Sequence, residues 1–195
     1  MSEILFIRHA ETDMAGSFCG YSDPELNEHG QLQLIELTNK LRTETIGAVY
    51  TSDLRRAHRT ALAIAETFGI DCHVRPALRE IDFGQWEGLT WRSIETRDRA
   101  YAQRWIAEYP HLPAPTGENF CDFEQRVLNE VSFLSRSARA SDHNIAVVTH
   151  AGVLRTVLRM SGCSDEYAWR QTSPYCSIVR YTCGAICPQT AEVPS

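Results

Sequence analysis

Two histidines occupy matching positions in the sequence, each just after a short apolar run. His9 follows the run Ile4–Arg8, and His150 follows the run Ile145–Thr149. Such runs predict buried parallel strands, and open α/β sheets bind ligands at the carboxyl ends of their strands. One histidine in this place is commonly structural, but two at equivalent positions indicate a site. A neutral imidazole can act there as a nucleophile or a base, and Arg8 would attract an anion.

Two further segments place charged side chains near the same predicted edge. Ser52–Ala61 follows another apolar run and contains the adjacent Arg55 and Arg56, which helical periodicity does not separate. A solvated basic helix face is the other interpretation of this segment. Leu78–Gly88 is an apolar, glycine-containing loop with acidic residues, of which Glu80 is the first. These acidic residues either shape turns or supply a carboxyl group for proton transfer.

The pattern of apolar residues predicts strands that alternate with helices. Strands are expected at Glu3–Arg8, Gly47–Thr51, around Val74, at Ile145–Thr149 and at Ser177–Thr182. Helices are expected at 27–42, from an N-cap at Ser52 to Phe68, at 91–109, from Phe120 to Leu134 and directly after His150. This alternation predicts an α/β fold with a largely parallel sheet. We expect residues 1–195 to form a single domain, with 110–117 as an internal loop and 184–195 as a loose tail.

The composition argues against several classes of protein. Nineteen basic and 25 acidic residues give a net charge of −6, so nucleic acid is not an expected partner. Eighteen of the basic residues are arginines and Lys40 is the single lysine, which argues against a P-loop. No apolar stretch approaches the roughly 18 residues of a membrane span, and the N-terminal run is too short for a signal peptide.

The seven cysteines include no CxxC pair. Cys183 and Cys187 come closest to the spacing of a metal motif, but no paired ligand set accompanies them. We therefore expect buried or free thiols, no metal site, and a soluble cytoplasmic protein.

Six segments in a fixed order carry a resemblance to a known family. They are Arg8–Thr12, Cys19–Asp23, Ser52–Ala61, Leu78–Gly88, Pro115–Glu118 and Thr149–Arg155. With these segments the chain resembles the histidine phosphatase superfamily, in its phosphoglycerate mutase-like branch. The resemblance implies a three-layer α/β/α sandwich with a mixed, mostly parallel sheet. It also implies phosphoryl transfer through a phosphohistidine, without a metal or another cofactor.

The family's catalytic roles carry over to matching positions. His9 matches the nucleophile, and Arg8 and Arg56 match the arginines that grip the phosphoryl oxygens. Glu80 matches the proton donor. His150 matches the second pocket histidine, which in protonated form would help to neutralise the phosphoryl charge. Only the family pattern Ser-x-Leu-x-Arg-Ala selects Arg56 over its neighbour.

Weaker candidates lie near these residues. Cys19 and Gly20 match a Thr-Gly pair that lines the substrate site of the mutases. Ala151 begins a helix whose free backbone N–H groups would attract an anion. Asp82 is the next candidate for the proton donor, and Glu118 either contacts a ligand or stabilises a helix start.

Departures from the true mutases favour water as the phosphoryl acceptor. Mutases have a longer insertion after the Glu80 region with a lysine and paired arginines, whereas Lys40 lies elsewhere and no such pair follows. Ala15 stands where the mutases have asparagine. The chain is similar to short bacterial members that dephosphorylate α-ribazole phosphate or other small phosphomonoesters. A phosphatase acting on a small phosphorylated metabolite is therefore predicted. Mutase-type transfer and a non-catalytic phosphoryl-binding module are the alternatives, and the oligomeric state is not indicated.

Overall fold

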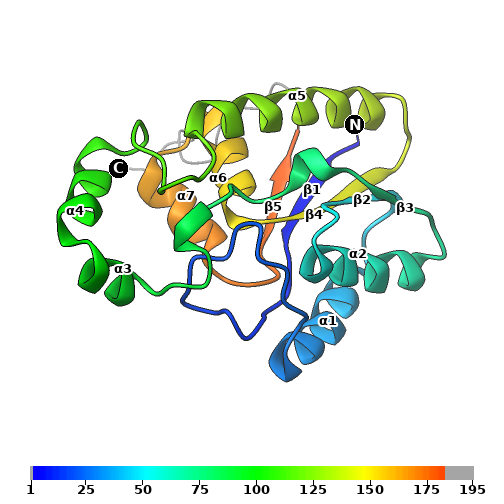
Figure 1. The fold of residues 1–195 in the computed structure, drawn as a ribbon. Helices are drawn as coiled ribbons and strands as arrows, with labels where there is room; N and C mark the ends of the chain where they lie inside the picture. Colours follow the sequence, from blue (N-terminus) through cyan, green and yellow to red (C-terminus); the bar gives the residue numbers. More distant parts are fainter. Residues whose placement is uncertain (1, 183–195) are drawn as a thin grey trace, which may run out of the picture.

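The computed structural model describes residues 2–182, which form a five-stranded sheet flanked by helices (Figure 1). The strands are β1 (Ile4–Arg8), β2 (Ile46–Thr51), β3 (Cys72–Val74), β4 (Asn144–Thr149) and β5 (Ile178–Tyr181). Their order in the sheet is β3-β2-β4-β1-β5, and only β5 runs antiparallel to its neighbour. The prediction of an α/β fold with a mixed, mostly parallel sheet is confirmed. The tail expected at 184–195 lies outside the described residues.

Helices cover both faces of the sheet, which gives the predicted three layers. Helices α1 (Glu28–Leu41) and α2 (Arg55–Phe68) lie on one face, and α5 (Phe120–Arg139) and α6 (Ala151–Met160) lie on the other (Figure 1). Strand β1 shows why the residues from Ile4 to Ile7 are all apolar. Leu5 and Ile7 pack with the first pair of helices, whereas Ile4 and Phe6 pack with the second pair. Burial on both faces is the cause of the continuous apolar runs.

A helical segment at one side of the sheet differs from the expected single helix at 91–109. It consists of α3 (Trp91–Arg97) and α4 (Arg99–Glu108), separated by Asp98. The Asp98 carboxylate accepts a hydrogen bond from the backbone N–H of Tyr101 at 3.0 Å, so this residue caps a new helix and interrupts the first. The single-turn helices η1 (Pro76–Leu78) and η2 (Gly84–Trp86) precede them.

Two other local predictions need correction. Ser52 is not the N-cap of α2, because that helix begins at Arg55 with Leu54 as its cap, and the Ser52 hydroxyl lies deeper in the molecule. The sequence pattern also missed helix α7 (Asp165–Thr172), whose cap at Ser164 lies among polar residues.

The cysteines agree in part with the expectation of buried or free thiols. The free thiols among the described residues are Cys19, Cys72, Cys121 and Cys176, whereas Cys163 is disulfide-bonded, which the prediction did not include. From residue 2 to residue 182, no helix is both long enough and apolar enough to cross a membrane.

Candidate active site

Adjacent strands bring the two histidines together. Strands β1 and β4 pair in parallel with Arg8 opposite Thr149, and the backbone N–H of His9 donates to the Thr149 carbonyl at 2.9 Å. The two imidazole rings of His9 and His150 then lie with their centroids 5.1 Å apart. A pocket of about 240 Å³ opens beside them, and we call it the phosphoryl pocket. Of the predicted site residues, Arg8, His9, Cys19, Glu80 and Ala151 line it.

The hydrogen bonds of His9 define which ring nitrogen carries the proton. Its Nδ1 lies 2.7 Å from the carbonyl oxygen of Ala10, and Arg56 Nε donates to its Nε2 at 3.2 Å. Since Nε2 accepts, the proton resides on Nδ1. Burial, together with the positive charges of Arg56 and Arg8, lowers the pKa of His9 well below its ordinary value of 6.5. His9 is therefore neutral, with a nucleophilic lone pair on Nε2.

The neighbouring arginines on α2 occupy different environments. Arg56 is fully buried, and besides His9 its guanidinium binds the carbonyl oxygens of Cys19, Gly20 and Ser22 at 2.6–3.2 Å. Arg55 lies at the surface, where it pairs with acidic side chains of the loop before α1. The structure therefore brings Arg56 and not Arg55 to the site. The two terminal nitrogens of Arg56 bind the loop at residues 19–22, a structural role that the sequence did not indicate.

Arg8 lines the pocket, and its side chain has a hydrogen-bond donor that no described residue accepts from. One of its terminal nitrogens donates to the carbonyl oxygens of Thr172 and Ser173 at the end of α7. Its guanidinium lies 4.0 Å from the centroid of the Tyr175 ring. Arg8 Nε is buried and has no hydrogen-bond partner among the described residues. An anion in the pocket would supply the missing acceptor.

His150 is held by a serine that the sequence assigned to a helix cap. Its Nε2 lies 3.0 Å from the Ser52 hydroxyl, and its Nδ1 is buried without a partner among residues 2–182. Burial, with the charge of Arg56 next in importance, lowers the pKa of His150 well below 6.5. His150 is therefore neutral in the structure without a ligand, and its protonated form remains an expectation for the phosphoryl-bound site. An incoming dianion would reverse this preference, because an opposite charge favours the protonated form.

Glu80 is held by two backbone N–H groups and by the side chain of Arg126. Its carboxylate oxygens accept from the N–H groups of Ile81 at 3.0 Å and Gly152 at 2.9 Å. Its carbonyl oxygen accepts from Arg126 of α5 at 2.8 Å. A Cβ on Gly152 would lie 2.1 Å from the Glu80 carboxylate, so only glycine permits this approach. Arg126 is an internal residue of a long helix, and nothing in its spacing pointed to this role.

Cys19 and Gly20, two of the weaker candidates, lie in the loop before α1 and have different surroundings. Cys19 lines the phosphoryl pocket, and burial raises the pKa of its thiol. Gly20 does not line it, because its N–H donates at 3.1 Å to Glu87. The same carboxylate accepts from the backbone N–H groups of residues 21, 22 and 83. Gly20 thus serves the shape of the loop, and Glu87 is the anchor that the sequence did not single out.

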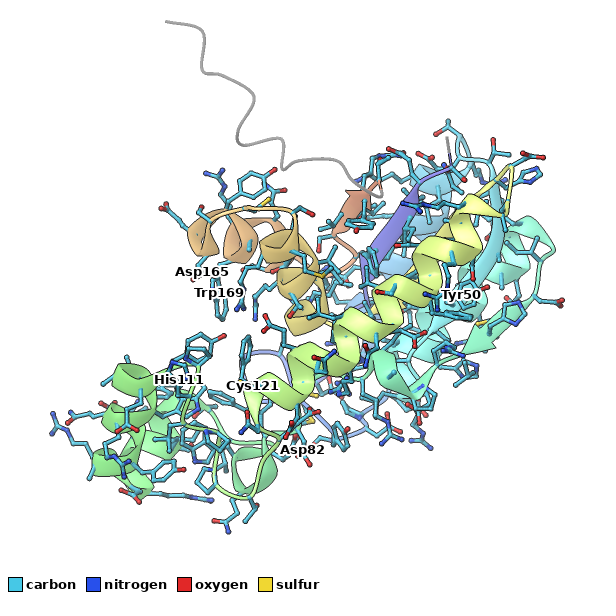
Figure 2. All side chains as sticks on the ribbon, turned by 90° about the horizontal axis from the view of Figure 1, so that it is seen from above. Tyr50, Asp82, His111, Cys121, Asp165 and Trp169 are labelled. Atoms are coloured by element: carbon cyan, nitrogen blue, oxygen red, sulfur yellow. The ribbon has the colours of Figure 1, made fainter. Side chains whose placement is uncertain are left out.

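The other acidic candidates bind protein groups away from the phosphoryl pocket. Asp82 accepts from the N–H of Gly84 at 2.8 Å, and it lies near the start of α5 (Figure 2). Glu118 pairs with Arg126 at 2.7 Å, which supports the helix-start interpretation. Within residues 2–182, no group of three histidine, cysteine or acidic side chains could hold a metal ion.

Comparisons with known proteins identify the family of the chain. The family model described as "Histidine phosphatase superfamily (branch 1)" matches residues 4–192. A "Putative phosphoserine phosphatase 2" of Hydrogenobacter thermophilus is 30% identical, over 87% of this chain and 83% of that protein. An "Adenosylcobalamin/alpha-ribazole phosphatase" of Escherichia coli is 31% identical, over 85% and 82% of the two chains. The crystal structure of the alpha-ribazole phosphatase from Shigella flexneri superposes with a TM-score of 0.80 at 28% identity, covering 91% and 89%.

The family match and the similarity to these phosphatases identify the protein as a phosphatase, that is, a phosphoric monoester hydrolase. Its family follows from the match over nearly the whole chain. The protein belongs to the histidine phosphatase superfamily, branch 1.

Proposed function

We propose that the protein hydrolyses a small phosphomonoester through a phosphohistidine on His9. The observation that carries this proposal is the buried, neutral imidazole with its proton on Nδ1 and its Nε2 hydrogen-bonded to Arg56. The Nε2 lone pair forms a bond to phosphorus while the ester P–O bond breaks. Glu80, which is protonated when the substrate is bound, gives its proton to the leaving alkoxide. Water then attacks phosphorus, the P–N bond breaks, and Glu80 takes the proton from that water. Inorganic phosphate leaves, and both residues return to their first state.

Three cationic or donor groups would stabilise the transferring phosphoryl group. Arg8 offers its unpartnered Nε, and Arg56 offers the Nε–H that now binds His9. His150 offers Nδ1, which carries a proton and can donate it in a hydrogen bond when a bound dianion favours the imidazolium. The N-terminus of α6 at Ala151 adds backbone N–H groups, because its cap residue His150 makes no side-chain hydrogen bond to them and Glu80 binds the one at Gly152.

Hydrolysis fits this pocket better than a mutase reaction. A mutase must retain its released intermediate, which requires further cationic anchors. Lys40, the single lysine, lies in the last turn of α1 and does not line the phosphoryl pocket. Two similar proteins are named as phosphatases of phosphoserine and of alpha-ribazole phosphate, which supports a small phosphorylated metabolite as the substrate.

A panel of phosphomonoesters tests the proposal directly. We expect stoichiometric release of inorganic phosphate and no transfer between hydroxyl groups of a phosphoglycerate. Transfer without release would establish the mutase reaction instead, and binding without either would establish a phosphoryl-binding module. Either result, transfer without release or binding without turnover, would overturn the proposal.

Arg56→Ala and Arg55→Ala form a matched pair that tests the arginine on α2. Loss of the Arg56 donor should lower kcat/KM by an amount worth about 2.7–4 kcal/mol, as for other donors to a transition-state oxyanion. The loop carbonyls at Cys19, Gly20 and Ser22 also lose their partner, so KM should rise as kcat falls. Arg55→Ala should change both constants little. Steady-state kinetics on folded variants measure this, and equal losses would contradict the assignment.

Stability should depend on pH through the two buried histidines. The pKa of each is depressed in the folded chain, chiefly by burial, so the unfolded chain binds more protons as pH falls below about 6.5. The free energy of unfolding should therefore be highest above this pH and decrease below it, by up to about 1.4 kcal/mol per pH unit for each histidine. Urea denaturation at several pH values measures the slope. His150→Gln should reduce the slope and His111→Gln, at an exposed site, should not. Equal slopes would refute the assignment.

A further inference from the structure

A second cavity, of about 400 Å³, adjoins the phosphoryl pocket. Four residues line both spaces: Phe18, Glu80, Phe83 and Arg155. Because Glu80 is the proposed proton donor to the leaving alkoxide, the second cavity begins where the leaving group must lie. The side chains that line it therefore influence which leaving alcohol the enzyme accepts.

The walls of this second cavity are mostly aromatic. Its aromatic lining beyond the shared residues is Trp105, Tyr109, Phe120, Phe123 and Trp169, and we call it the aromatic cavity. Ile81, Ile106, Gly152 and Arg159 complete its walls. Figure 2 shows Trp169 of α7 above the segment around His111, with Cys121 at the start of α5 beside that segment. Neighbouring rings are already stacked against one another, with centroids 5.7 Å apart for Trp105 and Tyr109 and for Tyr109 and Phe120. The rings are thus packed before any ligand arrives.

Several of these apolar side chains remain accessible. Ile106 is 59% exposed and Trp169 is 52% exposed. A leaving group as small as that of phosphoserine would leave most of a 400 Å³ space filled with water against aromatic walls. Ligand sites are usually lined by apolar and aromatic side chains with few polar groups, and they bury most of the ligand surface. The cavity therefore fits a larger, flat and apolar group.

Arg155 lies at the junction of the two spaces. It stacks on Trp169 at 3.4 Å from the ring centroid, and its Nε donates to the Thr172 hydroxyl at 3.2 Å. Burial lowers the pKa of Arg155 to about 10, although the charge of Glu80 acts in the opposite direction. A cation at this junction disfavours an ammonium group on the leaving alcohol and favours an oxygen acceptor beside the ester.

We propose that the substrate is a phosphomonoester whose alcohol carries an aromatic ring system, and that this ring binds in the aromatic cavity. The proposal rests on the hydrolysis proposed above and adds its substrate class. An aromatic side chain or ligand of this kind buries on the order of 150–250 Å², and stacks edge-to-face with the rings that line the cavity. Arg155 donates hydrogen bonds to oxygen atoms near the ester while its face stays on Trp169.

Two alkyl phosphates with similar leaving alcohols test the proposal. We expect 2-phenylethyl phosphate to exceed propyl phosphate in kcat/KM on the order of 10²-fold, since single methylene groups in a fitted pocket already give about 10-fold or more. Neither alcohol is activated, so a difference reports binding of the ring in the transition state rather than leaving-group chemistry.

A pair of matched variants locates the effect. Ile106→Trp fills the aromatic cavity from an exposed position on α4, and Ile35→Trp makes the same change on α1, at a residue that is 60% exposed and lines neither cavity. Ile106→Trp should remove the preference for the phenyl ester while propyl phosphate is hydrolysed as before. Ile35→Trp should keep the preference. An equal kcat/KM for the two esters, or a preference that survives Ile106→Trp, would overturn the proposed aromatic subsite.

Calorimetry with non-hydrolysable phosphonates separates this proposal from hydrolysis itself. Failure to release phosphate from either ester would overturn the proposed function, and 2-phenylethylphosphonate would still report on the cavity. Tighter binding than propylphosphonate, lost in Ile106→Trp, would support the aromatic subsite. Equal affinities would overturn it.

Discussion

Replacing His9 by alanine is expected to abolish turnover and the covalent intermediate together. The variant lacks the Nε2 lone pair that attacks phosphorus, and none of the other side chains that line the phosphoryl pocket presents a neutral imidazole there. Removal of a nucleophile that acts together with its partners costs on the order of 10⁶-fold in kcat in a well-studied protease. Rapid quench with labelled substrate, followed by mass spectrometry of the acid-labile phosphoprotein, measures both quantities.

His111→Ala is the control for this experiment. His111 is exposed and lies outside the phosphoryl pocket, so its loss should leave both turnover and phosphoprotein unchanged (Figure 2). Wild-type turnover in His9→Ala would remove His9 as the nucleophile. Phosphoprotein in His9→Ala, trapped at another residue, would do the same.

Glu80→Gln is expected to slow phosphorylation of the enzyme more with an alkyl phosphate than with p-nitrophenyl phosphate. An alkoxide needs a proton to leave, whereas nitrophenolate leaves readily without one. General acid catalysis typically contributes about 10²–10⁴-fold, so the two esters should differ by this order in single-turnover experiments. Glutamine retains an oxygen to accept the N–H of Gly152, so the local hydrogen bonding is largely kept.

Dephosphorylation must be measured separately, because Glu80 acts there as the base for either ester. Asp82→Asn is the matched control, since Asp82 binds the N–H of Gly84 and does not line the phosphoryl pocket. It should affect the two esters equally. If Glu80→Gln slowed phosphorylation equally with both leaving groups, Glu80 would not be the donor.

The strand ends explain how much of the site was predictable. A buried parallel strand has a distinctive apolar run, and the residues after two such runs meet wherever the strands are neighbours. Sequence alone therefore placed His9 and His150 at one edge, and the family pattern selected Arg56. Helix α2 then turns Arg56 inwards and leaves Arg55 at the surface, which residue spacing did not distinguish.

The supports of these residues could not be predicted, because they bind backbone groups far away in the chain. Arg126 holds the carbonyl oxygens of Ala77, Arg79 and Glu80, and Glu87 holds the N–H groups of the loop at residues 20–22. Nearly every residue has both backbone groups, so the residue type does not show which of them will bind a distant side chain. The aromatic cavity was not predicted for a related reason. Its rings come from five separate segments, and each ring alone resembles an ordinary core residue.

The hydrogen bond from Arg56 Nε to His9 Nε2 has a consequence for the catalytic cycle. On the proposed route this lone pair becomes the bond to phosphorus, so the Arg56 N–H loses its acceptor at the moment of phosphorylation. A phosphoryl oxygen, now attached to the same nitrogen, is the nearest replacement. The guanidinium keeps its three bonds to the loop carbonyls throughout, so it needs no search for a new position. In the resting enzyme His9 Nε2 thus occupies the acceptor position that a phosphoryl oxygen takes during turnover. The free-energy cost of reorganising the donors therefore stays small.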